Sequence, residues 1–264
     1  MAPRGSKKPI WVVEKERARR AAASETVWLF GLHAVRDALQ NPAREKLRLI
    51  LTKNAADRLG GDLLAGCGLE PEIVDPRKFT APLDPGSVHQ GAALEVKPLN
   101  WGDLQGLVTQ SEDRPIVVML DRVTDPHNVG AILRSAEVFG ATAVIAPTRH
   151  SAPETGALAK TASGALERQP YVRVTNLAKS MESLRDMGFA LIGLDGESSP
   201  ELGDVIAEQG DRPLALVFGA EGPGLREKTK DTCDVLAKIP AQGAFGSLNV
   251  SNAVAVTLYA CRSM

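Results

Sequence analysis

Three segments of this 264-residue sequence place glycines and polar side chains directly after apolar runs. They read "DPHNVGAILR", "VFGAEGPG" and "IPAQGAFGSLNVSNAVAV", and their candidate chemical groups are Asn128, Arg134, Glu221, Ser247 and Asn249. Amides, a hydroxyl, a carboxylate and a guanidinium can orient a polar substrate, while glycines let the backbone approach a ligand closely. The uncharged groups of the third segment suit the hydrogen-bonding edge of a neutral heterocycle better than they suit a phosphate.

Each segment taken alone also has a purely structural interpretation. Asn128 can cap a helix whose apolar residues recur at helical spacing, and Arg134 can pair with Glu137 on its surface. Glu221 can be a favourable charge near the start of a helix at Pro223. The glycine pattern of the second segment is neither a dinucleotide fingerprint nor a P-loop. Helix capping explains one or two polar groups of the third segment, but hardly all of them.

The elements that must position these groups form a parallel α/β domain. Beyond Pro115 the apolar runs "IVVML", "TAVIAP", "YVRV", "FALIGLD", "LALVFG" and "VLAKIP" are separated mostly by helical patterns. Such continuous runs predict strands that are buried on both faces of a parallel sheet. Ligands of these sheets bind beyond the carboxyl ends of the strands, where all three segments lie.

A smaller α/β unit precedes this domain. Its expected elements are a helix in "GLHAVRDALQN", a strand "LRLILT", a helix "AADRLGGDLLAGCG" and a strand "AALEV". Turn formers and charges after that strand predict a linker. The expected organisation is a basic tail over 1–25, a small domain over 26–98, a linker over 99–113 and a larger domain over 114–264.

Charge and cysteine content limit the partners and the compartment. Residues 1–100 hold 16 Lys and Arg against 12 Asp and Glu, although the whole chain has a net charge of -1. The basic tail is either a solvated segment or an arm that lies on phosphates; it lacks the apolar core of a secretory signal. No apolar run is long enough for a membrane span. Three scattered cysteines fit a reducing cytoplasm.

The four histidines are not expected to bind a metal. His33, His89, His127 and His150 share no metal-ligand spacing, and structural or surface roles explain them. No metal is needed for any feature of the three segments.

Taken in this order, the three segments closely resemble the signature motifs of the SpoU (TrmH-like) RNA ribose 2'-O-methyltransferases. The smaller unit, through "LFGLHAVRDAL" and "HQGAALEVKP", resembles the accessory substrate-binding domain of that family, which is related to small RNA-binding ribosomal proteins. The resemblance covers about residues 27–264. It implies a trefoil-knotted SPOUT-type catalytic domain that binds S-adenosylmethionine and forms a homodimer through that domain.

The resemblance also implies roles for individual residues. The catalytic cluster comprises Asn128, Arg134, Glu221, Ser247 and Asn249. The cofactor-binding set comprises Gly219, Glu221, Gly222, Ile239, Leu248, Asn249 and Asn252. Glu221 is expected to orient Arg134 or Asn128 at the rim of the cofactor site.

The implied reaction is attack of a ribose 2'-oxygen on the methyl group of the sulfonium cofactor. Arginine stays protonated in proteins, so we expect Arg134 to act as a cation that binds a phosphate and stabilises oxyanion character. Asn128 and Asn249 are expected to orient the sugar or the arginine.

The separate N-terminal domain favours large-subunit ribosomal RNA as substrate, with a guanosine as the methylated nucleotide. Two alternatives remain, a transfer-RNA methyltransferase and a non-catalytic RNA-binding or assembly protein. The expected RNA surface combines the tail with basic residues of the small domain, whose linker would let that domain move until RNA fixes it. These residues are Arg36, Arg44, Lys46, Arg48 and Lys53.

Overall fold

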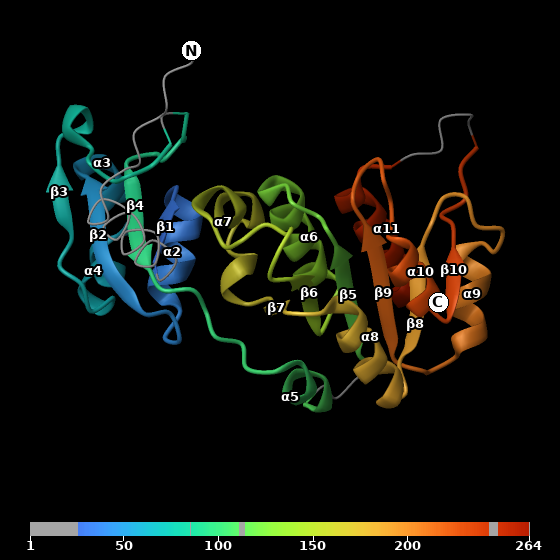
Figure 1. Cartoon of the computed structure of the whole chain (residues 1–264). Coiled ribbons are helices and arrows are strands. Elements are labelled where there is room, and N and C mark those ends of the chain that lie inside the picture. Colours follow the sequence, from blue (N-terminus) through green and yellow to red (C-terminus); the bar gives the residue numbers. More distant parts are fainter. Residues whose placement is uncertain (1–25, 85, 111–113, 243–247, 264) are drawn as a thin grey trace, which may run out of the picture.

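The computed structural model describes residues 26–84, 86–110, 114–242 and 248–263. Two sheets lie side by side, the smaller at the left of Figure 1 and the larger at the right, with helix α7 between them. The expected N-terminal tail lies outside the described residues. No helix in the described part of the chain has both the length and the apolar character to cross a bilayer.

The smaller sheet has four strands in the order β1-β4-β2-β3. Strand β4 runs antiparallel to β1 and β2, and β3 runs parallel to β2. The expected helix after β2 is divided into two, because Gly60 adopts a left-handed φ of 92° between them. The elements of this unit are β1 (Val27–Phe30), α2 (Leu32–Gln40), β2 (Lys46–Thr52), α3 (Lys53–Leu59), α4 (Gly61–Gly66), β3 (Glu72–Val74), η1 (Pro76–Lys78) and β4 (Ala92–Val96).

The larger sheet has six parallel strands in the order β10-β8-β9-β5-β6-β7. Along β5, Ile116 and Val118 face one apolar core, and Val117 and Met119 face the other. Both faces of the sheet are therefore buried, as the apolar runs predict. The strands are β5 (Ile116–Asp121), β6 (Ala143–Pro147), β7 (Tyr171–Val174), β8 (Ala190–Leu194), β9 (Leu214–Gly219) and β10 (Val235–Ala237).

Helices cover both faces of this sheet. Buried residues of α6, α7, α9 and α11 belong to one core, and those of α8 belong to the other. Helix α5 lies within the expected linker, where Leu104 and Leu107 pack against the second core. Helix α9 was not expected. The bounds are α5 (Leu104–Thr109), α6 (Pro126–Val138), α7 (Gly156–Ala162), η2 (Ala165–Glu167), α8 (Leu177–Asp186), α9 (Leu202–Gln209), α10 (Glu227–Thr232) and α11 (Val250–Ser263).

The two units are packed together rather than loosely tethered. A Cβ atom on Gly156 of α7 would lie 2.4 Å from the Phe30 ring and from the Trp28 carbonyl oxygen, so the helix directly contacts β1. The side chain of Arg44 is fully buried and pairs with Glu167 at 2.7 Å and Glu154 at 3.2 Å. The expectation of a freely moving first domain is therefore wrong for this structure.

The order of the larger sheet reverses between β5 and β9. These strands pair from Ile116 and Leu214 to Asp121 and Gly219, so the loops that follow them emerge side by side. Such a reversal is where open α/β sheets bind ligands.

Candidate active site

A hydrogen-bonded cluster joins the three polar segments at this reversal. Oε1 of Glu221 accepts hydrogen bonds from Nδ2 of Asn128 at 3.1 Å and from Nδ2 of Asn249. Nδ2 of Asn249 also lies 2.9 Å from Oδ1 of Asn128. The backbone N–H of Val250 donates to the same Glu221 oxygen at 3.4 Å. The sequence prediction that these three side chains meet agrees with this geometry.

The side chain of Asn128 can join the cluster because another residue caps the helix. Helix α6 begins at Pro126, and Asp125 caps it by accepting from the His127 N–H at 2.9 Å. The expectation that Asn128 is the helix cap is therefore wrong, because the carboxylate three residues earlier already fills that position. On the other side of the cluster, Asn249 is held by Ser251, whose N–H and hydroxyl both donate to Oδ1 of Asn249.

The glycine segment folds back on itself and holds Glu221 at the edge of the sheet. A Cβ atom on Gly219 would lie 2.1 Å from the carbonyl carbon of Gly224, so no side chain fits there. Gly222 and Gly224 have φ angles of 83° and 68°, which favour glycine. Helix α10 begins only at Glu227, so Glu221 does not belong to a helix terminus as the structural interpretation expected.

Asp121 anchors the far end of this segment to β5. Its carboxylate is buried and accepts from the Arg226 N–H at 3.1 Å and from the Thr229 hydroxyl at 2.7 Å. The guanidinium of Arg226 also pairs with it at 2.6 Å. The loop that carries Glu221 is therefore fastened at both ends.

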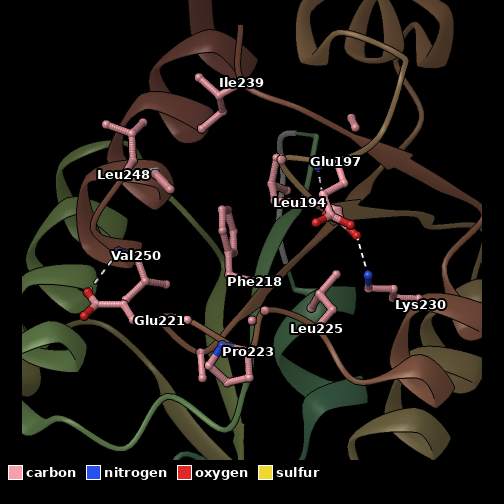
Figure 2. Close-up of a pocket in the computed structure, with 18 of the residues that line it drawn as sticks. Leu194, Glu197, Phe218, Glu221, Pro223, Leu225, Lys230, Ile239, Leu248 and Val250 are labelled. Atoms are coloured by element: carbon pink, nitrogen blue, oxygen red, sulfur yellow. Dashed lines mark hydrogen bonds and ion pairs between the residues drawn. The ribbon is translucent and has the colours of Figure 1, made fainter. Parts of the chain in front are cut away.

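A pocket of about 840 Å³ opens beside the cluster, between the loops after β8, β9 and β10. Figure 2 shows Phe218, Leu225 and Leu194 on its apolar floor, with Ile239 and Leu248 above them. Five of the seven residues predicted to bind the cofactor line it, namely Gly219, Glu221, Gly222, Ile239 and Leu248. Asn249 belongs to the adjoining cluster.

Asn252 is the exception among the predicted cofactor residues. It is exposed on α11 and is not one of the residues that line the pocket. Val250 and Ala253 of the same helix do line it, so the helical period turns Asn252 to another side. The geometry therefore does not place Asn252 at the pocket, and its cofactor role stays a prediction.

The pocket carries more negative than positive charge. Asp195, Glu197 and Glu221 line it together with one lysine, Lys230. Lys230 lies 2.6 Å from Asp195, and this hydrogen bond lowers the pKa of the Asp195 carboxyl group. Apolar walls and an excess of carboxylates fit S-adenosylmethionine, which combines an adenine ring with a cationic sulfonium centre.

A second, smaller pocket of about 140 Å³ lies on the other side of Glu221. It shares Ala220, Glu221 and Val250 with the larger pocket and is completed by Asn128 and the loop 122–125. The cluster therefore forms the partition between a large pocket and a small one.

One predicted catalytic residue that the structure describes, Arg134, does not join the cluster on this chain. Arg134 is exposed on α6, and within the described residues it makes no hydrogen bond or ion pair with Asn128, Glu221 or Asn249. Six residues separate Arg134 from Asn128, which turns their side chains about 120° apart around the helix. The expectation that Glu221 orients Arg134 is therefore not met, whereas its contact with Asn128 is. Ser247 lies outside the described residues.

The predicted RNA surface needs one correction. Arg44 is buried in the interface between the two units, where Glu154 and Glu167 neutralise it, so it is not a phosphate contact. Arg48 is exposed but pairs with Glu72 at 2.6 Å. Lys53 is exposed and Lys46 is partly exposed, while the partly exposed Arg36 donates to the Arg58 carbonyl at 2.9 Å.

Some lining residues were missed from the sequence. Asp195 comes at the carboxyl end of a strand that was predicted, so its position at that edge of the sheet was a usable signal. Phe218 and Leu225 resemble ordinary core residues, and nothing in the sequence distinguishes them. Within the described ranges, no group of three or more His, Cys, Asp or Glu is arranged to hold a metal ion.

Comparison with known proteins matches both units. Residues 115–259 match the SpoU rRNA Methylase family, and residues 28–102 match the RNA 2'-O ribose methyltransferase substrate binding family. The 23S rRNA (guanosine-2'-O-)-methyltransferase RlmB of Vibrio cholerae is 42% identical over 236 residues, 88% of this chain and 94% of that protein. RlmB of Pseudomonas putida is 38% identical over 238 residues, again 88% and 94%.

Solved structures agree with the fold. The SpoU methyltransferase AviRb of Streptomyces viridochromogenes, in complex with AdoMet, superposes with a TM-score of 0.76 at 25% identity. The match covers 94% of this chain and 93% of that one. An rRNA methyltransferase of Sinorhizobium meliloti shares the fold with a TM-score of 0.73. These matches confirm the predicted α/β class with a parallel sheet, and the chain belongs to the SpoU rRNA methylase family.

Proposed function

We propose that this chain transfers a methyl group from S-adenosylmethionine to the ribose 2'-oxygen of a guanosine in 23S ribosomal RNA. The observation that carries the proposal is the Asn128–Glu221–Asn249 cluster between a large pocket and a small one. A donor in the large pocket and a ribose in the small one would meet at this cluster. The RlmB relatives, whose names state this reaction, support the choice of substrate.

The larger pocket holds the cofactor in this proposal. The glycine segment and the side chains of Phe218, Ile239 and Leu248 enclose it, and the carboxylates of Asp195 and Glu197 favour its positive charge. S-adenosylmethionine supplies a methyl group that is already activated for attack by a nucleophile. The protein therefore needs chiefly to align the ribose, and alignment alone can lower a barrier by about 7–11 kcal/mol in favourable cases.

The cluster supplies this alignment. Three donors fix Oε1 of Glu221, and no hydrogen bond from another described residue engages its Oε2. Oε2 can therefore accept a hydrogen bond from the 2'-hydroxyl and turn the oxygen lone pair toward the methyl group. Asn128 reaches the small pocket directly and orients the sugar, as the sequence indicated.

Arg134 would reach the site only from a second copy of the chain. Helices α6 and α11 pack together and expose apolar residues: Val138 is 70% exposed, Tyr259 62% and Val256 44%. This apolar surface supports the expected homodimer through the larger domain. We assign Arg134 to the active site of the partner, where its cation would stabilise the reacting oxygen.

The finer features of the fold also belong to this proposal. The return of α11 across the sheet to pack against α6, the first helix of the domain, supports the trefoil knot. The substrate-binding match over 28–102 supports an RNA-binding role for the smaller unit, with the domain boundaries expected above. Such an enzyme would work in the cytoplasm, where ribosomal RNA is transcribed and assembled.

The test is methyl transfer from labelled S-adenosylmethionine to total RNA from cells that lack this gene. Label in the large ribosomal RNA that disappears with Asn128→Ala supports the proposal. Label in transfer RNA keeps the mechanism and overturns the substrate. Cofactor binding without label in RNA or precursor particles favours the non-catalytic assembly protein.

A further inference from the structure

The carboxyl edge of the larger sheet divides into two halves of opposite charge. After β8 and β9 come Asp195, Glu197 and Glu221, all of which line the cofactor pocket. After β5 and β6 come Arg122, Arg149 and His150, which are exposed. The boundary between the two halves is the reversal of strand order, where the Asn128–Glu221–Asn249 cluster lies.

The carboxylates near the positive half are already engaged. Asp121 is buried against Arg226, and Asp125 caps helix α6. In the described part of the chain, neither Arg122 nor Arg149 lies within ion-pair distance of any carboxylate. These two guanidinium groups therefore keep their donors for an external anion.

The backbone at this edge is held in an unfavourable conformation. Arg122 has φ 64° and His150 has φ 61°, so both are non-glycine residues in the left-handed region. That conformation costs about 1–2 kcal/mol per residue and persists only where the surrounding structure enforces it. Glycine would fit either position with less strain, so a larger side chain is present there at a conformational cost.

The loop that carries Arg149 and His150 is rigid and attached to the loop of Arg122. The Thr148 N–H donates to the Val174 carbonyl at 2.7 Å, and the Ala152 N–H donates to the Val123 carbonyl at 3.3 Å. The hydroxyl of Tyr171 donates to the Ala152 carbonyl at 2.7 Å. Arg173 donates to the carbonyl of Thr148 and so supports the same loop. The guanidinium group of Arg149 and the neighbouring imidazole of His150 are therefore carried by a loop that is held at several points.

Arg122 and Arg149 lie near the small pocket, where the ribose is proposed to bind. Arg122 lines the small pocket together with Asn128 and Glu221. Strands β5, β6 and β7 are adjacent, and two strand spacings of about 4.8 Å make this half of the edge about 10 Å wide. Strand β7 is the edge strand on the side of the smaller unit (Figure 1).

We propose that Arg122, Arg149 and His150 form a track for RNA phosphates, which leads from the smaller unit to the small pocket. Arg122 contacts the phosphate next to the reacting ribose, and Arg149 with His150 contacts the adjoining backbone. Guanidinium groups suit this task because they bind phosphate oxygens in pairs, and such contacts fix register without reading a base. The inference rests on the proposed function, since it assigns the substrate path of that same site.

The test is the salt dependence of RNA binding by the full-length chain. The probe is an unmodified transcript of large-subunit ribosomal RNA, and the double variant is Arg122→Gly with Arg149→Gln. The log of the RNA affinity falls with the log of the salt concentration, and each lost phosphate contact on single-stranded RNA makes this slope shallower by about 0.7. The double variant should therefore have a slope that is shallower by about 1.4. Arg212 is exposed and lies just before β9, where the amino ends of the strands lie. Arg212→Gln is therefore the matched control and should keep the wild-type slope.

Two further readouts separate this proposal from a structural effect and from the proposed function. Glycine relieves the strained backbone at residue 122, so the melting temperature should not fall below that of the wild type, and the S-adenosylmethionine affinity should stay at its wild-type value. Arg122→Lys, which keeps the positive charge that Arg122→Gly removes, should keep most of the wild-type slope. A double variant that transfers methyl groups and keeps the wild-type slope overturns the track and leaves the function standing. Wild-type protein that transfers no methyl group overturns the function, while the slope still reports on the track.

Discussion

Hydrogen bonds within the cluster hold the side chains of Asn128 and Glu221 in one orientation. Glu221 lies between two pockets, and its Oε1 is saturated by two amides and a backbone N–H. The carboxylate can neither rotate nor exchange partners without breaking these bonds. The polar groups at the proposed reaction centre are therefore oriented before any substrate binds, which is the condition for strong transition-state stabilisation.

Loss of Asn128 should therefore affect turnover and not cofactor binding. We expect Asn128→Ala to lower the single-turnover rate of methyl transfer by about 100-fold or more, the usual effect of removing one preorganised donor. S-adenosylmethionine affinity, measured by equilibrium dialysis, should change little because Asn128 does not line the larger pocket.

The matched control is Asn252→Ala, which removes an exposed amide from α11. It should leave both quantities at wild-type values. A loss of cofactor affinity in Asn252→Ala would support the sequence-based prediction that this residue binds the cofactor. An equal loss of affinity and rate in Asn128→Ala would place that residue in the cofactor site.

At the scale of elements, the glycine segment is fixed by contacts that leave no room for side chains. Gly219 lies against the backbone of Gly224, and Gly130 of α6 lies against Leu158 and Thr161 of α7. A Cβ atom on Gly130 would come within 2.6 Å of the Leu158 carbonyl oxygen. Close approach at Gly219 therefore fixes the fold of the glycine segment, and close approach at Gly130 fixes how α6 packs on α7.

Gly219→Ala should displace this segment. The added methyl group would meet backbone atoms of Gly224 and Leu225 at 2.1–2.4 Å, and backbone cannot rotate away as a side chain can. We expect a lower melting temperature and a loss of S-adenosylmethionine affinity of at least 10-fold. Gly61→Ala is the control, since nothing lies within 4 Å of its added methyl group. Wild-type affinity in Gly219→Ala would mean that the segment does not shape the cofactor site.

The sequence predicts most elements of the larger sheet because their apolar runs are long and separated. It fails for α9, whose pattern in "LGDVIAEQ" is short, and for the start of α10, where Pro223 resembles a helix beginning. Within the site, the motif residues were predictable through a family resemblance. Arg122 was not, because a single arginine after a strand has no local pattern, and its meaning comes from the left-handed backbone and from neighbouring loops.

At the scale of the whole molecule, one apolar core extends from the smaller unit into the larger one. Arg44 lies in their interface, and with Glu154 and Glu167 it forms a buried ion network that also holds the carbonyl of Lys97. Sequence alone could not place Arg44 there, because its two carboxylate partners are more than 100 residues away. The interface holds the smaller unit in a fixed position, so the proposed RNA track begins at a fixed distance from the small pocket.

Arg44→Met should destabilise the protein strongly. Removal of one partner leaves buried carboxylates without compensation, which typically costs 3–5 kcal/mol. Urea unfolding followed by circular dichroism measures the loss. Arg48→Met removes an exposed pair with Glu72 and should leave the midpoint within error. Equal midpoints for the two variants would show that the buried ion network contributes no stability.

High pH should also weaken the folded state. Burial raises the pKa of Cys233 from 9.0 to about 12 and that of Tyr171 from 10.0 to about 12. The folded state therefore holds these protons more tightly than the unfolded state, so the stability contribution is complete below pH 9 and is lost between about pH 9 and 12. Urea midpoints at several pH values should fall in this window. Cys233→Ala should make the decrease of the urea midpoint with pH less steep. An equally steep decrease in this variant would contradict the raised pKa of Cys233.

The most direct test of the proposed function is the chemical identity of the product nucleoside. Purified protein, labelled S-adenosylmethionine and unmodified 23S ribosomal RNA are incubated, and the digested RNA is analysed by chromatography and mass spectrometry. The proposal predicts label in 2'-O-methylguanosine at one site, and no label with Asn128→Ala. Label in a base-methylated nucleoside, or in a ribose of another nucleotide, would contradict it.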